Sequence, residues 1–353
     1  MIKIIGGGPV GCHLAANLAK KKDVTIFEEN KKIGTPVQCT GILTHTINNV
    51  LKVNTNWVEN KIYQTRIFAP NKKTIEINFK KPNIIINRKL FDEHLEQKAI
   101  DEGVKIFYEH KFVKPFVVKN LKTKKEEKIK FEKLIGADGP RSTVRKAIGL
   151  NPITCLSGIQ AIIKQKNNNC IDFYPYIGEY AWAVPESENI LRVGIAARRD
   201  AGKIFRDFKK KYPGKIISWQ SGVIPLHNPR TQTENKNIYF VGDSAGQIKN
   251  TTGGGIIPGL IAAEKLSEAI IQNKNYTKLW KKKIGKELWL HYQIRRVMNN
   301  FSQKDWNKLI ETFNKDPIKK VLSEKSRDEP IGLITKLILK EPKLLLYIRR
   351  FWK

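Results

Sequence analysis

The first 28 residues constrain the fold of this chain more than any other segment. An apolar run at residues 2–5 leads into the glycine-rich loop 6–11, and an apolar segment follows at residues 10–18. This pattern is typical of a strand that turns into a helix, where glycines let the backbone approach a pyrophosphate at the helix N-terminus. A second apolar run, residues 24–27, is followed by Glu28, at a position where a carboxylate can accept a hydrogen bond from a ribose hydroxyl. The sequence therefore predicts a nucleotide-binding βαβ unit.

Two further motifs extend this prediction. Gly136-Ala137-Asp138-Gly139 follows a strand-like run at residues 129–135, and Gly242-Asp243 follows the apolar run 238–241. A glycine-rich loop ending in Gly254, Gly255 and Ile256 then precedes a helical pattern over residues 258–271. Each motif alone also fits an ordinary tight turn, and an aspartate at the end of a strand often only caps the next turn. Together they indicate one site that binds a phosphate or a flavin ring.

With Gln38-Cys39-Thr40-Gly41 and Arg88 added to these motifs, residues 1–275 resemble the geranylgeranyl reductase family, within the larger para-hydroxybenzoate hydroxylase-like group. The resemblance implies FAD as cofactor. The FAD contacts that it implies are Gly6, Gly8, Val10, Gly11, Glu28, Cys39, Thr40, Gly41, Arg88, Val113, Asp138, Asp243, Gly254, Gly255 and Ile256. For Arg88 a solvated place at the start of a helix is the alternative. No group of residues with metal-ligand spacing is visible, so we expect no metal.

The resemblance also implies a reaction, in which reduced FAD saturates double bonds of the geranylgeranyl chains of archaeal-type membrane lipids. Cys39 is then the candidate catalytic proton donor, and a small apolar contact with the flavin ring is an equally good interpretation of this thiol. Tyr180, Trp182 and Pro185 are the expected residues of the lipid cavity. Val184 replaces the phenylalanine usual in the family, and Glu186 stands where a basic residue is usual. The external reductant would be NAD(P)H or a ferredoxin-type electron-donor protein.

Two other functions remain open at this point. An FAD-dependent monooxygenase or halogenase of an aromatic compound would share the fold, and the Cys39 segment argues against it. A non-catalytic, basic peripheral membrane protein would also fit the charge. The presence of every FAD motif argues against a non-catalytic role.

The charge predicts an anionic partner. The chain has 65 Lys and Arg against 33 Asp and Glu, a formal net charge of +32. No nucleic-acid-binding motif is visible, so we expect no nucleic acid, and an anionic membrane surface fits better. Codon bias or adaptation to high salt would also produce an excess of cations. No apolar run reaches the ~18 residues of a membrane span, so we expect a cytoplasmic protein, peripherally associated with the inner face of the cell membrane.

These patterns predict an α/β fold with a Rossmann-like FAD-binding domain, an antiparallel-sheet substrate domain and a helical C-terminal region. We expect the FAD-binding domain to be discontinuous, over residues 1–44, 84–150 and 224–275. The substrate domain would comprise residues 45–83 and 151–223, and the basic helical region residues 276–353. Residues 331–353 mix leucines and aromatic residues with cations, which is typical of a segment in the plane of lipid headgroups. Packing against the protein is the alternative.

Overall fold

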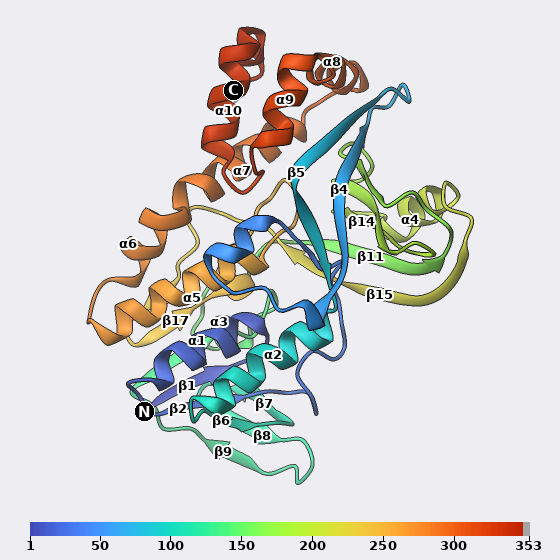
Figure 1. Ribbon diagram of the computed structural model, residues 1–353. Coiled ribbons are helices and arrows are strands. Elements are labelled where there is room, and N and C mark those ends of the chain that lie inside the picture. The colour runs from blue at the N-terminus through green and yellow to red at the C-terminus, as the bar shows by residue number, and fades with distance from the viewer. Residues whose placement is uncertain (349–353) are drawn as a thin grey trace.

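The computed structural model describes residues 1–348 and contains two large sheets, one above the other in Figure 1. The lower sheet has six strands in the order β16-β17-β10-β1-β2-β6. All its pairs are parallel except β16 with β17. Its bounds are β1 (Ile2–Ile5), β2 (Val24–Phe27), β6 (Lys105–Phe107), β10 (Lys133–Gly136), β16 (Glu234–Asn235) and β17 (Ile238–Phe240).

Helices cover one face of this sheet because its central strands are mostly apolar and largely buried. The covering helices are α1 (Pro9–Ala19), α2 (Arg88–Asp101) and α5 (Ile256–Ile271), and their buried residues form one core with β1 and β2. The other face packs against a small sheet of β7 (His110–Lys114), β8 (Val117–Asn120) and β9 (Glu126–Lys128), and against α3 (Thr143–Ala147).

The second sheet has eight strands in the order β15-β11-β14-β13-β12-β4-β5-β3, and it is antiparallel except where β12 pairs with β4. Its edge strand β15 alternates exposed and half-buried residues over most of its length, whereas the central strands β12, β13 and β14 are buried almost throughout. Helix α4 (Ala201–Lys209) packs on β14 and β11. The bounds are β3 (Ile42–Leu43), β4 (Val58–Phe68), β5 (Thr74–Ile86), β11 (Cys155–Lys164), β12 (Cys170–Tyr174), β13 (Tyr180–Ser187), β14 (Ile190–Ala197) and β15 (Lys215–Pro225).

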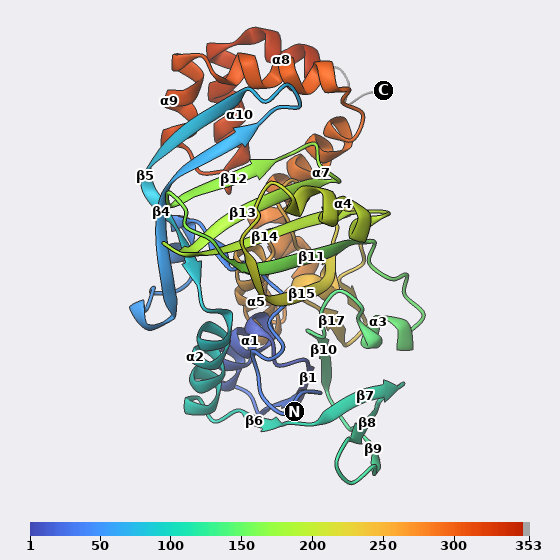
Figure 2. The same ribbon diagram turned by 90° about the vertical axis from the view of Figure 1, so that its right-hand side faces the viewer.

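The C-terminal helices lie over the long β4–β5 hairpin, as Figure 2 shows. Helix α9 packs on β5, and α10 packs on α9 and α7. Trp306, Ile318, Val321 and Leu337 are buried in this cluster. The helices are α6 (Tyr276–Trp280), α7 (Lys286–Met298), α8 (Gln303–Phe313), α9 (Asp316–Glu324), α10 (Pro330–Lys340) and α11 (Leu345–Ile348). Within residues 1–348, no helix is both long and apolar enough to span a bilayer.

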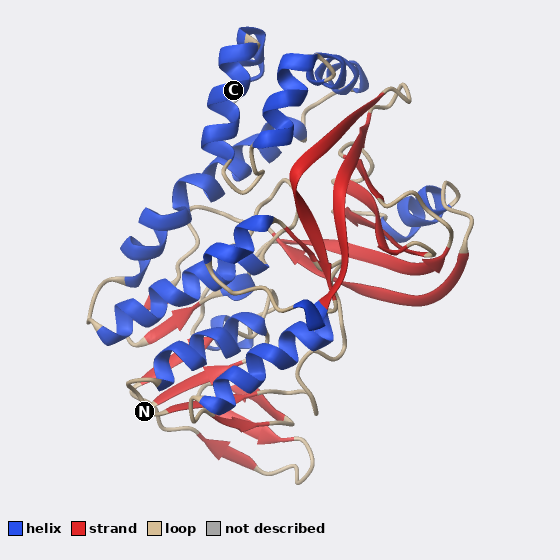
Figure 3. Ribbon diagram, viewed as in Figure 1, coloured by secondary structure: helices blue, strands red, loops and turns tan. Residues whose placement is uncertain are grey.

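The predicted fold class is confirmed: Figure 3 shows a mixed α/β protein with a helical C-terminal region. One predicted strand, residues 114–119, is wrong, because Phe116 has φ +60° and turns the chain between β7 and β8. The eight-stranded sheet takes β3 from residues 42–43 and keeps β5 as far as Ile86, slightly beyond the predicted domain boundaries. The division into domains stays a proposal.

Candidate functional site

In the glycine loop between β1 and α1, backbone atoms lie so close to other backbone atoms that side chains at Gly6 and Gly11 would collide with them. Gly6 has φ +101°, and a Cβ on it would lie 2.7 Å from the carbonyl carbon of Ala137. A Cβ on Gly11 would collide with the Gly6 carbonyl, whereas a Cβ on Gly8 would meet no atom of residues 1–348 within 4 Å. Helix α1 begins at Pro9, and no side chain in the described part of the chain caps its N-terminus. The loop therefore leaves the positive end of the helix dipole open at Gly8.

Glu28 closes the other side of this loop. Its buried carboxylate accepts hydrogen bonds from the Gly7 backbone N–H at 2.7 Å and from the backbone and side chain of Asn30 at 2.9 and 2.7 Å. The predicted acid at the end of β2 is thus fixed against the glycine loop. Val10 packs against Gly242 and Gly259, so its side chain joins α1 to the third motif. Val113 lies on β7, with 41% of the residue exposed.

Asp138 has one carboxylate oxygen in use. Its Oδ2 accepts hydrogen bonds from the Thr143 hydroxyl at 3.0 Å and the Val144 N–H at 3.1 Å, at the start of α3. Its Oδ1 is buried and has no partner among the described residues. Burial raises the pKa of this carboxyl, although hydrogen bonds from Ser142 and Val144 oppose the rise. Because buried polar atoms are normally paired, the free oxygen is available to accept a hydrogen bond from a ligand.

A cavity of about 550 Å³ lies where the loop 38–45, the eight-stranded sheet and the loop 243–256 meet. This volume lies within the range of small-molecule sites. Its polar end holds Cys39, Arg88 and Asp243, which come from three separate motifs. Its apolar wall is formed by alternate residues of the strands, namely Ile67, Ile77, Phe79, Ile171, Phe173 and Ile224.

Arg88 is held in place at the first turn of α2. Its guanidinium donates to both oxygens of Asp92, at 3.1 and 2.9 Å, and 16% of its side chain is exposed. Burial lowers its pKa, but Asp92 and Cys39 more than offset this, so the pKa lies above its ordinary value. The structure therefore does not support the interpretation of Arg88 as a solvated residue.

Asp243 enters the cavity from the end of β17, opposite the first turn of α5. Burial raises the pKa of its carboxyl to about 6, and the positive charge of Arg88 opposes the rise. A Cβ on Gly255 would lie 2.8 Å from Asp243 Oδ1, so any side chain at this position would displace the carboxylate. Gly254 accepts a hydrogen bond from Lys249 at 3.2 Å, and Ile256 begins α5.

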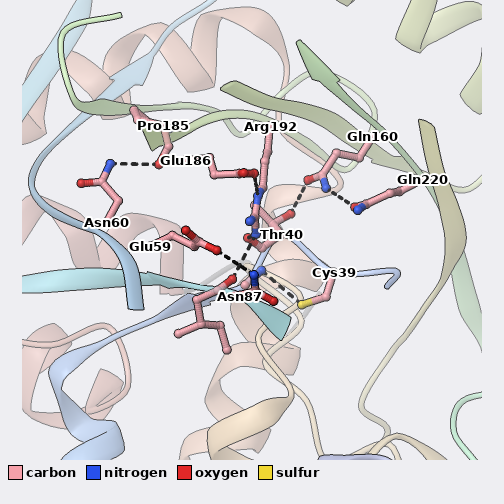
Figure 4. Close-up of polar contacts among 12 residues, drawn as sticks. Cys39, Thr40, Glu59, Asn60, Asn87, Gln160, Pro185, Glu186, Arg192 and Gln220 are labelled. Atoms are coloured by element: carbon pink, nitrogen blue, oxygen red, sulfur yellow. Dashed lines mark hydrogen bonds and ion pairs between the residues drawn. The ribbon is translucent and has the colours of Figure 1, made fainter. Parts of the chain in front are cut away.

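A polar network crosses the cavity beside Cys39. The Thr40 hydroxyl and the Trp182 indole both donate to Gln160 Oε1, at 2.6 and 2.9 Å, and Gln160 donates to Gln220 at 2.6 Å. The Gly41 N–H points to the Cys39 sulfur at 3.3 Å. Figure 4 shows Cys39, Thr40 and Gln160 together. This network fixes the Trp182 ring and the loop of Cys39 relative to one another.

The three expected cavity residues divide two to one. Tyr180 and Trp182 line the cavity, and their rings lie 5.9 Å apart. Pro185 is buried near the end of β13 and is not among the described residues that line the cavity, and its carbonyl accepts a hydrogen bond from Asn60 at 3.2 Å, so its place in the lipid cavity stays a prediction. Tyr180 and Trp182 are two residues apart on β13 and therefore lie on the same face of the sheet.

Sequence reasoning missed several residues of the site. Gln160, Gln220 and Arg192 come from interior positions of strands, where nothing in the sequence marks them as different from core residues. Lys249 and Asp328 form a buried ion pair beside the cavity, and Thr44 and Thr46 donate to the same carboxylate. Since Lys249 and Asp328 are far apart in the sequence, only the tertiary structure brings them together.

Residues 1–164 match the family described as "FAD binding domain". The chain is a flavoprotein. The match covers the glycine loop, Glu28, Cys39, Arg88 and Asp138 of the flavoprotein, whereas Asp243 and the loop before α5 lie beyond it.

Curated relatives match the flavoprotein over its whole length. It is 25% identical to a digeranylgeranylglycerophospholipid reductase of Methanothrix thermoacetophila, over 99% of the chain and 98% of the relative. It is 29% identical to digeranylgeranylglycerophospholipid reductase 3 of Methanosphaera stadtmanae, with the same coverage.

Two solved structures share its fold. A geranylgeranyl bacteriochlorophyll reductase-like protein of Thermoplasma acidophilum superposes with a TM-score of 0.85 at 19% identity, covering 99% of this chain and 98% of the other. A flavin-dependent halogenase superposes with a TM-score of 0.67 at 14% identity, covering 98% and 77%. The halogenase is the more distant fold.

The residues of the flavoprotein fit FAD. Gly8 lies at an open, uncapped helix N-terminus suited to a pyrophosphate, and Glu28 and the free oxygen of Asp138 are acceptors for hydroxyl groups. At the polar end of the cavity, Arg88 and Asp243 supply a cation and a titratable acceptor. This set of donors and acceptors matches a dinucleotide cofactor with hydroxyl-rich linkers.

Proposed function

We propose that this flavoprotein reduces carbon–carbon double bonds in the geranylgeranyl chains of glycerophospholipids. The observation that carries the proposal is the apolar cavity that starts at Cys39 and Asp243 and continues along β4, β5 and β12. A chain of isoprene units offers no hydrogen-bonding groups, so an apolar channel suits it. The named reductases that match the chain over its full length support the same substrate class.

The reaction balances with one hydride and one proton for each double bond. FAD, when reduced, supplies the hydride to one alkene carbon, and the other carbon must take up a proton. Cys39 is the proton donor that we propose, because its thiol lines the cavity beside Arg88. Tyr180 and Trp182 would exclude water from the reacting segment of the lipid. The oxidised cofactor would then be reduced again by NAD(P)H or by a ferredoxin-type protein.

The surface beside the cavity suits contact with an anionic membrane. Lys80 and Lys81 are exposed at its rim, and Lys80 pairs with Glu324 at 2.9 Å. The nearby α10 lines the cavity with Leu333 and leaves Leu339 75% exposed. Leu345 and Leu346 are 47% and 57% exposed. We propose that this surface rests on the cytoplasmic face of a bilayer, where a lipid substrate can enter. Phe351 and Trp352, which we also expected to insert, lie outside the described residues.

The test is a single-turnover assay with the flavin reduced chemically under anaerobic conditions and mixed with unsaturated glycerophospholipid in vesicles. We expect a mass gain equal to two hydrogens for each saturated bond, together with reoxidation of the flavin. An aromatic monooxygenase would instead need oxygen and add one oxygen atom. Failure of the lipid to reoxidise the flavin, with an aromatic compound accepting oxygen, would contradict the proposal.

A further inference from the structure

Arg192 is a buried cation that the reaction above does not use. It lies on β14, paired with Val184 of β13, and 8% of its side chain is exposed. Its Nε donates to Glu186 Oε2 at 2.7 Å, and its Nη1 donates to the backbone carbonyls of Thr40 at 2.6 Å and Ile86 at 3.3 Å. Figure 4 shows the guanidinium between Glu186 and Thr40.

The two carbonyls belong to the two segments that form the polar end of the cavity. Thr40 follows Cys39, and Ile86 is the last residue of β5, immediately before the cap and first residue of α2, Asn87 and Arg88. The same two segments are joined by the Ile86 N–H, which donates to the Gly41 carbonyl at 2.9 Å. One guanidinium therefore ties the loop of Cys39 to the start of the helix that carries Arg88.

Gly41 shows how closely the guanidinium approaches this loop. It has φ +75°, and a Cβ on it would lie 2.7 Å from the Ile86 carbonyl oxygen and 3.0 Å from Arg192 Nη1. The Gly41 N–H in turn faces the Cys39 sulfur at 3.3 Å. The conformation that places Gly41 beside Arg192 thus also sets the direction of the thiol.

The ion pair accounts for a departure noted in the sequence. Glu186 stands where the family that the chain resembles usually has a basic residue, and here it supplies the counter-charge of Arg192. A buried ion pair by itself adds little to stability, because desolvation offsets the attraction. The hydrogen bonds from Arg192 to the carbonyls of Thr40 and Ile86 instead indicate that the pair holds these two segments together.

We infer that Arg192 is a positioning residue, which holds the loop 39–41 so that the Cys39 thiol faces the cavity. Only the expected effect on lipid reduction rests on the proposed function; the position of the thiol does not. A planar guanidinium can satisfy Glu186 and both carbonyls at once, whereas a lysine ammonium cannot match that geometry. The positioning role therefore requires arginine and not merely a positive charge.

The experiment compares Arg192→Lys and Arg192→Met in the FAD-loaded full chain with Arg66→Met as the matched control. Arg66 belongs to the same sheet and pairs with Asp172 at 2.7 and 3.0 Å. Since its neighbours Thr65 and Ile67 line the cavity, its side chain is on the opposite face. The probe is iodoacetamide, with labelling of Cys39 read from its peptide mass.

In both Arg192 variants we expect FAD content to be retained and Cys39 to be alkylated about 10-fold faster, because the loop opens more often. Single-turnover reduction of lipid should slow while the lipid concentration at half-saturation stays the same. Arg66→Met should leave the labelling rate unchanged.

An unchanged labelling rate in both Arg192 variants would overturn the inference. So would loss of folding in both while Arg66→Met folds, since that result makes Arg192 a purely structural residue. If Arg192→Met alone fails to fold, the labelling rate of Arg192→Lys decides. The labelling experiment needs no lipid. If the unaltered protein does not reduce lipid, the proposed function is contradicted, and the labelling rates still test the role of Arg192.

Discussion

The indole of Trp182 lies directly against Gly194 on the neighbouring strand, where a Cβ would be within 2.6 Å of the ring atom Cε2. The two residues are register partners of β13 and β14. Only a residue without a side chain lets the indole lie flat here and donate to Gln160. Gly194 therefore decides the shape of the cavity wall without lining the cavity itself.

We predict that Gly194→Ala displaces Trp182 and reduces lipid turnover while FAD stays bound. Overpacking of this kind typically costs about 1–3 kcal/mol of stability. Melting temperature, flavin absorbance and single-turnover rate are the measurements. Gly202→Ala is the control, because a Cβ there meets nothing within 4 Å and the residue lies in α4. Equal effects of the two substitutions on turnover would contradict the role of Gly194.

A second prediction concerns the open side of Gly8. Because no described residue lies within 4 Å of a Cβ at this position, Gly8→Trp should leave the fold intact and block the cofactor. We expect the purified variant to keep its circular dichroism spectrum and to lose its yellow colour. Gly202→Trp, at the open position in α4, should retain FAD. A Gly8→Trp protein with normal flavin content would show that FAD does not occupy this helix N-terminus.

The thiol of Cys39 provides a third prediction. Cys39→Ala and Cys39→Ser should keep FAD and thermal stability, while single-turnover reduction of lipid slows by about 10²-fold if the thiol is a general acid. Cys155→Ser is a suitable control, since Cys155 is half-buried and does not line the cavity. Unchanged reoxidation of the flavin by lipid would leave Cys39 as a packing residue.

The raised pKa of the Asp243 carboxyl predicts that the free energy of unfolding depends on pH. Burial raises the pKa of this carboxyl in the folded state to about 6, from an ordinary value of 3.8. The folded state therefore holds this proton more tightly, and the stability that it contributes is complete below about pH 4 and is lost as the pH rises to about 6. The loss is at most about 3 kcal/mol.

Urea denaturation of the FAD-free protein and of Asp243→Asn at several pH values measures this effect. The free energy of unfolding of the unaltered protein, relative to the variant, should fall between pH 4 and 6 and stay constant above. A difference that does not change over this interval would mean that Asp243 titrates normally.

The fifth prediction is that binding to anionic vesicles weakens steeply with salt. Screening shortens from about 30 Å at 0.01 M to about 10 Å at 0.1 M ionic strength. Replacing Leu339 and Leu346 together by glutamate should weaken binding further, because both are more than half exposed, and should leave FAD content unchanged. Co-sedimentation with anionic and neutral vesicles is the measurement. Equal binding to both kinds at low salt would contradict a membrane role for this surface.

The sequence by itself determined the nucleotide-binding half of the protein. The order of strand, glycine loop, helix and acid in residues 2–28 predicts β1, α1 and β2, because each of these elements is formed by residues that are close together in the sequence. The motifs at Asp138 and Asp243 could be placed beside them for the same reason, since parallel strands end at one edge of a sheet. The structure brings Asp243 and Arg88 to one cavity with Cys39.

Only the tertiary structure decided how the cavity is closed and held. Arg192 of β14 contacts Thr40 in the loop before β3, and Gln160 of β11 contacts Trp182 of β13, although the two residues of each pair are distant in the sequence. The place of Tyr180 and Trp182 in the cavity lining follows in the same way, from the position of β13 in its sheet. Such contacts depend on strand register and on which face each side chain takes, and a single sequence carries no local signal for either.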